Sequence, residues 1–409
     1  MQPPNAFTIG LLLFVACLVA MVTRRFRLPY SVGLVLAGLG LSALPVAIDL
    51  SLTPALIFTV FLPPLIFEAA IQIPWKPFRR ELPLLLLLVT VGVALAAGVV
   101  AAGMHYLVGW SWLGAGFFGV LIAATDPVAV ISMFKTVDVD DRLDLLVEAE
   151  SLLNDGAAAV GFAVLLGIAG GASMSVPEIG GQLLLIVAGG LACGVAVTAP
   201  LLLIGGRTDD HLVEITLTTL AAYGSFLLAE HFHVSGVLAA LTAGLMVGNL
   251  GSIGSLSDRG HEAMLRFWEY IAFLANSFVF ILIGTSQGSI SLMPVLLAAA
   301  VAIGLVLLGR AAAVYPVAAL FARSTLRVPA GFQHVMWWGG LRGALSLALA
   351  LALPASVAER AEIIRVAFAV VAFSIFVQGL SMSRFARGLG LVREEAPPRN
   401  GEGDRPPQL

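Results

Sequence analysis

Long apolar runs follow one another along almost the whole chain, and they constrain its fold more than any other feature. A helix that crosses a bilayer needs about 20 predominantly apolar residues. Runs of that kind, separated by charged or Pro- and Gly-rich breaks, cover residues 7–23, 28–47, 52–73, 82–107, 112–134, 144–171, 181–204, 211–230, 234–250, 268–286, 292–321, 333–353 and 363–383. With 59% hydrophobic and 11% charged residues, the chain cannot cover a soluble surface. We predict an all-α polytopic membrane protein with about 13 transmembrane helices in a lipid bilayer.

The basic residues predict how these helices are oriented. Lys and Arg gather in the odd-numbered loops and after the last run, whereas the first five even-numbered loops contain none. The positive-inside rule then places the N-terminus outside and the C-terminus in the cytoplasm, across what we expect to be the plasma (inner) membrane. We predict one transmembrane unit over residues 1–390 and a disordered cytoplasmic tail over 391–409, which is polar and rich in Pro and Gly.

Composition and motifs also exclude several classes of protein. The net charge of −3 provides no basic field for nucleic acid. Cys17 and Cys193 lie in apolar runs without disulfide-scaffold or zinc spacing. Because no HExxH motif is present and no histidine within the runs pairs with a nucleophile, we expect neither an intramembrane enzyme nor a cofactor.

Charged residues inside the apolar runs are the strongest indication of function. The acids are Glu68, Asp126, Glu150 and Asp155, and the bases are Arg310 and Arg342. Each charge costs at least about 2.5–3.5 kcal/mol on insertion scales, so they are expected to face one another or a water-filled cavity. Since the acids outnumber the arginines, the site is expected to be negative and to suit a cation or protons.

Two runs contain residues that interrupt a helix. The interrupting residues are Pro127 in the fifth run and Gly339, Gly340 and Gly343, around Arg342, in the twelfth. Because proline disfavours helix at the preceding residue, the first break is expected at Thr125–Asp126–Pro127. Broken helices in corresponding halves point to a transporter site, and runs five and twelve correspond if two inverted six-helix repeats flank run seven. Proline kinking with small residues for helix packing is the alternative, which the charges at both breaks disfavour. We predict that the two broken helices cross at mid-membrane.

The sixth run places oxygen-bearing side chains on one helix face. These are Glu150, Ser151, Asn154 and Asp155, at positions i, i+1, i+4 and i+5. Hard cations prefer several oxygen ligands. A sodium site could therefore be made by Asp126, the Thr125 carbonyl, Ser151 and Asp155.

Four motifs resemble the monovalent cation:proton antiporter family, specifically its sodium/proton exchanger (NhaP-type) branch. They are FLPPLIFEAAI, ATDPVAV, ESLLNDGAAAV and GGLRGALSLALALALP, which occur in this order between residues 61 and 354. The resemblance implies thirteen spans in two inverted repeats, a mobile core domain that carries the ion site, a dimer domain and hence a homodimer.

The resemblance also implies roles for individual residues near the first break. Asp155 would be the ion- and proton-binding carboxylate. Asn154 would be its partner in the Asn-Asp pair that marks the electroneutral branch. Thr125 and Asp126 would be ligands from the unwound helix, and Ser151 a further ligand.

Other charged residues would support the site. Glu68 would help through water or guard access. Glu150 would form a buried ion pair with an arginine. Both Arg310 and Arg342 match family positions; we expect Arg310 to form the pair and Arg342 to lie at the crossing of the twelfth span.

These features predict secondary antiport of sodium, or lithium, against protons by alternating access. Cation and proton would compete for one buried carboxylate, and a 1:1 exchange would move no net charge. Potassium/proton exchange is the alternative, because the sequence does not reveal the size of the cavity. A cation channel is less favoured, since a channel needs no pair of broken helices with buried arginines.

Overall fold

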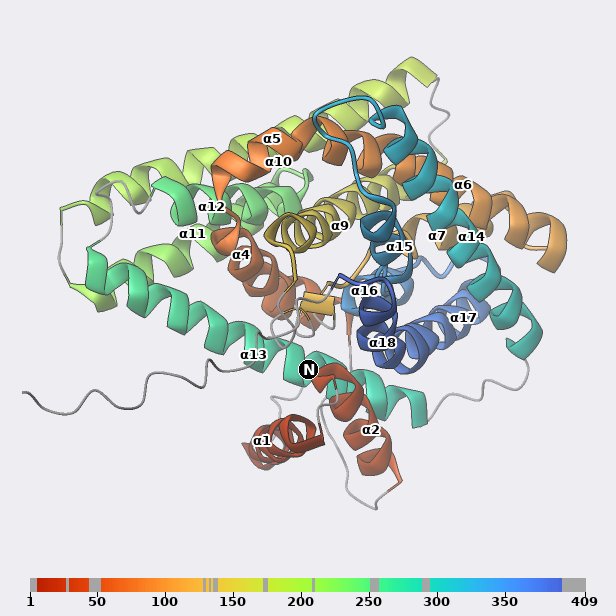
Figure 1. The fold of residues 1–409 in the computed structure, drawn as a ribbon, viewed down its shortest axis with the longest axis horizontal. Helices are drawn as coiled ribbons and strands as arrows, with labels where there is room; N and C mark the ends of the chain where they lie inside the picture. Colours follow the sequence, from red (N-terminus) through yellow and green to blue (C-terminus); the bar gives the residue numbers. More distant parts are fainter. Residues whose placement is uncertain are drawn as a thin grey trace, which may run out of the picture.

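Helices form all of the regular structure in the part of the chain that the computed structural model describes (Figure 1). The described residues are 6–26, 29–43, 53–127, 130–131, 134, 139–171, 176–207, 210–250, 257–288 and 295–391. The predicted tail over 391–409 lies outside them apart from Leu391, and so do residues 128–129 and 132–133 of the fifth run. The all-α fold predicted from the apolar runs is confirmed.

The helical segments comprise α-helices (α) and π-helical stretches (η). In chain order they are α1 (Ala6–Phe26), α2 (Tyr30–Ser42), α3 (Pro54–Leu56), η1 (Ile57–Phe61), α4 (Leu62–Gln72), α5 (Trp75–Leu87), η2 (Leu88–Gly92), α6 (Val93–Gly103), η3 (Met104–Val108), α7 (Trp112–Leu121), α9 (Asp141–Ala169), α10 (Val176–Gly205), α11 (His211–His231), α12 (Gly236–Leu250), α13 (Asp258–Gly288), α14 (Leu296–Leu320), α15 (Ala330–Trp338), α16 (Ala344–Leu351), α17 (Arg360–Phe373), η6 (Ser374–Gly379) and α18 (Leu380–Gly388).

Each predicted apolar run coincides with one or more of these segments. Within the described residues, nine continuous segments are long and apolar enough to cross a bilayer. The shorter apolar helices α2, α7 and α12 accompany them, and the twelfth run is divided between α15 and α16. The number of thirteen crossings stays a prediction.

The basic stretch before the fourth run is helical, although the sequence placed it in a loop. α5 begins at Trp75, because the first turn of a helix tolerates Pro77, whose missing N–H would have no helical partner there. Phe78 points into the protein and is buried, whereas Lys76 and Arg79 are exposed. The helix therefore starts outside the apolar run and carries its positive charges on an exposed face.

The helices pack as two groups that meet at α9, which lies near the centre of the ribbon view (Figure 1). In the first group α13 packs against α2 and α4, and α12 packs against α4, α10 and α11. In the second group α6 packs against α7 and α14, and α17 packs against α14 and α16. Helix α9 contacts α5 and α7 on one side and α10 and α12 on the other. The residues of α9 are thus held at the junction of the two groups.

Connections between the helices meet in two separate sets. Arg142, at the start of α9, pairs with Glu81 of α5 at 2.8 Å and donates to the carbonyl of Arg327, before α15. Glu359, before α17, accepts hydrogen bonds from the N–H and hydroxyl of Ser111, before α7. The first set joins odd-numbered connections and the second joins even-numbered ones, which agrees with a two-sided arrangement of the loops.

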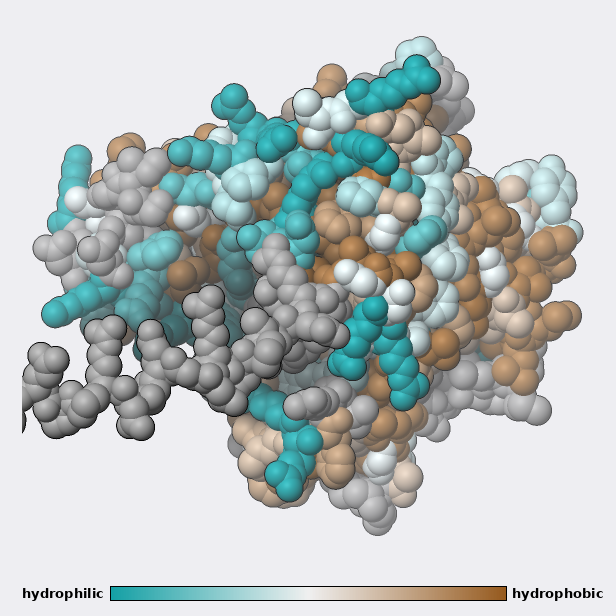
Figure 2. Space-filling view, viewed as in Figure 1, coloured by the Kyte–Doolittle hydropathy of each residue, from teal (hydrophilic) through white to brown (hydrophobic). Residues whose placement is uncertain are grey.

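Apolar side chains cover the rim of the molecule where it would face lipid. Figure 2 shows them on the right-hand side of the view, over α6 and α14. Leu95, Leu297 and Leu308 are among the exposed apolar residues of these two helices. An exposed apolar surface of this kind is expected of a polytopic membrane protein.

Candidate functional site

The fifth and twelfth runs are both interrupted, and their breaks meet. α7 ends at Leu121, and the chain continues without helix as far as Asp126. α15 ends at Trp338, and α16 begins at Ala344. Between the two breaks the backbone N–H of Asp126 donates a hydrogen bond of 2.8 Å to the carbonyl of Leu341. The predicted crossing of two broken helices is confirmed.

The first break is longer than the sequence predicts. We expected the interruption at residues 125–127, where proline acts on its neighbour, but α7 already ends at Leu121. The carbonyls of Ala123 and Ala124 instead accept hydrogen bonds from Nη1 of Arg342, at 2.9 and 3.1 Å. Because buried carbonyls need donors from some source, an arginine of the other broken helix replaces the helical N–H groups and allows the extra unwinding.

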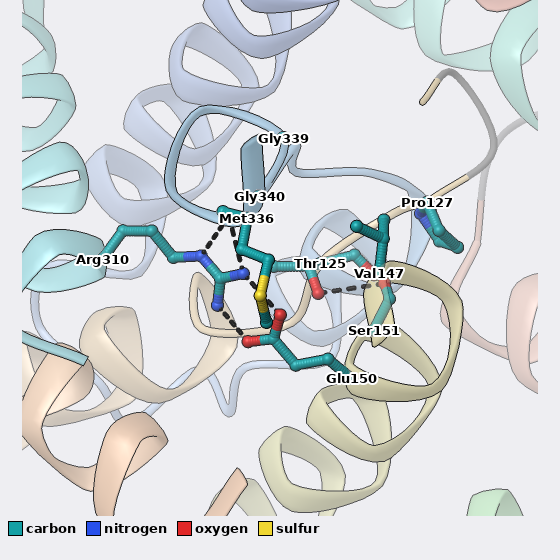
Figure 3. Close-up of a pocket in the computed structure, with 9 residues that line it drawn as sticks. All are labelled: Thr125, Pro127, Val147, Glu150, Ser151, Arg310, Met336, Gly339 and Gly340. Carbon is teal, nitrogen blue, oxygen red and sulfur yellow. Dashed lines mark hydrogen bonds and ion pairs between the residues drawn. The ribbon is translucent and has the colours of Figure 1, made fainter. Parts of the chain in front are cut away.

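Thr125 connects the first break to α9 (Figure 3). The Ser151 hydroxyl donates to the Thr125 carbonyl at 2.6 Å, and the Thr125 hydroxyl donates to Ser151 Oγ at 2.9 Å. Nδ2 of Asn154 donates to Thr125 Oγ1 at 3.2 Å and to Oε1 of Glu150 at 3.4 Å. The structure therefore brings together three residues that the sequence singled out: Thr125, Ser151 and Asn154.

Two acceptor oxygens of α9 stay without donors beside this network. Oδ1 of Asn154 and Oδ1 of Asp155 are buried and accept no hydrogen bond from any residue that the structure describes. The Asp155 carboxyl interacts with the charges of Asp126 and Arg342 and with the backbone of Thr125. Buried polar atoms are costly without partners, and carboxylate and amide oxygens are the ligands that hard cations prefer. Such an arrangement can bind a small cation or a proton.

Glu150 and Arg310 form a buried ion pair, and both line a small cavity that Thr125 and Ser151 also line (Figure 3). Nη1 and Nη2 of Arg310 bind the two carboxylate oxygens of Glu150 at 2.5 and 2.7 Å. Nε and Nη2 of Arg310 also donate to the carbonyl of Met336 at 3.1 and 2.9 Å. The two charges of the pair neutralise each other, so the charge of Asp155 is not compensated by Arg310.

The glycines of the twelfth run make room for charged side chains. A Cβ atom on Gly343 would overlap the carboxylate of Asp126, and one on Gly340 would lie 2.6 Å from Nε of Arg310. Gly339 and Pro127 line the cavity between the breaks together with Thr125, Val147, Glu150, Ser151, Arg310, Met336 and Gly340. Gly340 therefore permits the close approach of Arg310, and Gly343 that of Asp126.

Glu68 lies apart from the residues that line this cavity. It is half-buried on α4 and accepts a hydrogen bond from Gln72, one helical turn further on. Helix α4 packs against α9, but the lining residues of the cavity within the described part of the chain do not include Glu68.

Further polar groups hold the breaks, and the sequence interpretation did not include them. Gln378 donates to the carbonyl of Trp338 at 2.9 Å, at the end of α15, and Ser346 donates to the carbonyl of Ala124 at 3.3 Å. Both are buried polar residues within apolar runs, so their polarity in an apolar run could have marked them as candidate site residues. The Met336 carbonyl, which accepts from Arg310, could not be singled out from the sequence, because every residue has a carbonyl.

Two crossing broken helices with buried charges at their breaks are the arrangement found in ion-coupled secondary transporters. The comparisons with known proteins agree with this class. The family model "Sodium/hydrogen exchanger, transmembrane" matches residues 11–388, and the chain belongs to this family. The membership predicted from the four motifs is confirmed.

Individual relatives cover most of the chain. It is 37% identical over 386 residues to the Na(+)/H(+) antiporter ApNhaP of Aphanothece halophytica, a match that spans 92% of this chain and 72% of the relative. It is 31% identical to the Na(+)/H(+) antiporter NhaH of Halobacillus dabanensis, over 93% of this chain and 97% of the relative. The fold is similar to that of the sodium proton antiporter MjNhaP1 of Methanocaldococcus jannaschii, with a TM-score of 0.73, 21% identity and coverage of 93% and 97%.

Proposed function

We propose that this protein is a secondary antiporter that exchanges sodium, or lithium, for protons across the plasma (inner) membrane. The observation that carries this proposal is the pair of buried acceptor oxygens on Asn154 and Asp155, which have no donor among the described residues. They lie beside the crossing of two broken helices, in a member of the sodium/hydrogen exchanger family. The names of the relatives ApNhaP and NhaH support the choice of sodium and protons.

We assign cation and proton binding to residues of α9 and the first break. Asp155 is the carboxylate for which the cation and the proton compete, and Asp126, the Thr125 carbonyl and Ser151 are the further sodium ligands. The Asn154 amide nitrogen donates to Thr125 and Glu150, which leaves the Asn154 oxygen directed elsewhere and available as a neutral ligand.

Exchange follows from the competition at one carboxylate. Sodium binds the ionised form of Asp155, and protonation releases it. If the site changes its exposure only when it carries one or the other, each cycle moves one sodium ion against one proton. Because Asn154 has no titratable group and the Glu150 charge is paired with Arg310, the site exchanges one positive charge for another. The exchange is therefore electroneutral and independent of membrane potential.

The two helix groups provide the moving parts. The group of α5–α7, α9 and α14–α18 carries both breaks and acts as the mobile core domain. The group of α1, α2, α4 and α10–α13 acts as the dimer domain of a homodimer. The two domains are built from inverted repeats, with the N-terminus outside and the C-terminus in the cytoplasm. Glu68, on α4, guards access from the dimer-domain side.

The test uses purified protein in liposomes with a trapped pH dye. An imposed sodium gradient should drive protons in the direction opposite to sodium, and the dye reports this as a change in the internal pH. A lithium gradient should have the same effect. Asp155→Asn should abolish the pH change, because the amide keeps the shape of the side chain but cannot ionise. Asp141→Asn is the matched control, since it makes the same chemical change at an exposed position of the same helix.

The outcomes separate the alternatives. A pH change driven by potassium but not by sodium would replace the proposal with potassium/proton exchange. Flux without coupled proton movement would indicate a channel or an uncoupled carrier. A potential imposed with valinomycin should leave the rate unchanged, and a rate that follows the potential would contradict the electroneutral stoichiometry.

A further inference from the structure

A hollow lined by basic and aromatic side chains lies at the start of α5, and it shares no residue with the cavity at the ion site. It is lined by Trp75, Lys76, Arg79 and Arg80, and all four residues are exposed. Lys76, Arg79 and Arg80 stand at i, i+3 and i+4, so they share one face of the helix. In Figure 2 hydrophilic side chains cover the part of the view where Figure 1 draws α5.

The positive charge of this hollow is not neutralised by the protein that the structure describes. The neighbouring acid on the helix, Glu81, is buried and is bound by Arg142 through both of its carboxylate oxygens, at 2.8 and 2.9 Å. Within the described part of the chain, Lys76, Arg79 and Arg80 form no ion pair. Three clustered cations therefore remain available to an anion from outside the chain.

The position of the hollow favours an anion held at a membrane surface. α5 continues from this turn directly into the apolar stretch Leu82–Leu87, part of a segment long enough to span a bilayer. Trp75 is 43% exposed at the same level, and tryptophan prefers the interface between lipid headgroups and acyl chains. A soluble anion would need neither of these features.

Hydrogen bonds from α12 hold the backbone beside the hollow. The N–H of Trp75 donates to Oδ1 of Asn249 at 2.7 Å, and Nδ2 of Asn249 donates to the carbonyl of Ile73 at 3.0 Å. Phe78, in the first turn, is buried. The basic side chains thus project from a backbone that α12 fixes from the other helix group.

We propose that this hollow binds the phosphate of an anionic phospholipid headgroup, with Lys76, Arg79 and Arg80 as its cationic ligands and Trp75 packed beside the glycerol region. A phospholipid headgroup and inorganic phosphate both present a phosphate anion, and we assign the hollow to the phosphate of the lipid. The same basic residues lie in a set of connections that the sequence assigns to the cytoplasmic side, where anionic lipids attract basic segments next to transmembrane helices.

Isothermal titration calorimetry of the purified full chain in detergent tests the proposal, with dioctanoyl phosphatidylglycerol as the probe. Arg79→Gln/Arg80→Gln should weaken binding about 25-fold, since each basic residue near a headgroup contributes about fivefold. The matched control is Arg24→Gln/Arg25→Gln, which removes two exposed charges near the end of α1, also on the side predicted to be cytoplasmic. It should change the affinity less than twofold.

Several outcomes would overturn the proposal, and none of them depends on transport. Equal losses in the two double variants would show a general effect of net charge. Binding of dioctanoyl phosphatidylcholine as tight as that of phosphatidylglycerol would show that the anionic charge is not recognised. Inorganic phosphate that binds as tightly as the lipid would identify a site for free phosphate. Far-ultraviolet circular dichroism of each variant checks that the helices are intact.

Discussion

The backbone N–H of Asp126 donates a 2.8 Å hydrogen bond to the carbonyl of Leu341, and this contact joins the two broken helices at their breaks. Each broken end also faces a charge of the favourable sign. Arg342 binds the carbonyls that follow the C-terminal end of α7, and the Asp126 carboxylate lies against Gly343, immediately before the N-terminus of α16. Cations near C-terminal ends and anions near N-terminal ends of helices are stabilising. The crossing is therefore held by backbone and side-chain charges together.

Gly343→Ala tests the close approach between Gly343 and Asp126. The added methyl group would overlap the carboxylate, and overpacking of this kind costs about 1–3 kcal/mol. We expect exchange activity in liposomes to fall at least tenfold, as Asp126 is displaced. Gly98→Ala is the control, because nothing lies within 4 Å of a Cβ atom at that position. Normal exchange by Gly343→Ala would show that the position of Asp126 is not critical.

Arg310→Gln tests the buried ion pair. Removing one partner leaves the Glu150 carboxylate buried without its cation, which costs about 3–5 kcal/mol. We expect a marked decrease in the midpoint of thermal unfolding in detergent. Glu150→Gln/Arg310→Gln should recover part of the loss, since neither charge then remains. A double variant less stable than Arg310→Gln would contradict this explanation.

Asn154→Asp tests the neutral partner of Asp155. An ionised Asp cannot donate to Thr125 and Glu150, and its new charge would lie beside the Glu150 oxygen that Asn154 now contacts at 3.4 Å. Loss of a hydrogen bond is worth about 0.5–1.5 kcal/mol, so we expect the half-saturating sodium concentration to rise about tenfold. The measurement is the sodium dependence of dye-reported exchange. An unchanged value would exclude a role for these two hydrogen bonds in sodium binding.

Glu359 should make the stability of the fold depend on pH. It lies in the set of connections that contains Ser111, not in the set that contains Arg142. Partial burial acts to raise the pKa of Glu359, but hydrogen bonds from the Ser111 N–H and hydroxyl outweigh it and hold the pKa below its usual value of 4.5. A carboxyl of this kind stabilises the fold above its unfolded pKa and loses that contribution as the pH falls through its folded pKa.

Glu359→Gln should therefore lower the free energy of unfolding near neutral pH by about 0.5 kcal/mol, because the group is only partly shielded from water. The difference from the unchanged protein should shrink below pH 4.5. Thermal unfolding at a series of pH values measures it. Glu362→Gln is the control, since it removes a similar charge three residues away without the contact to Ser111.

The sequence by itself determined the membrane class, the helical fold and which two runs are interrupted. These features depend on composition and on local chemistry. Apolar runs must be helical in lipid because each backbone group needs a partner within the segment. Pro127 and the glycines around Arg342 act on their own neighbours, so their effect can be read without any tertiary contact.

Only the tertiary structure decided which groups meet. Both Arg310 and Arg342 matched the family, but the packing of α14 brings Arg310 to Glu150, while Arg342 turns to the carbonyls of Ala123 and Ala124. The early end of α7 has the same cause, because the donor that replaces its helical N–H groups comes from a segment more than two hundred residues away. Contacts between distant segments depend on how helices pack, and local sequence patterns carry no information about that.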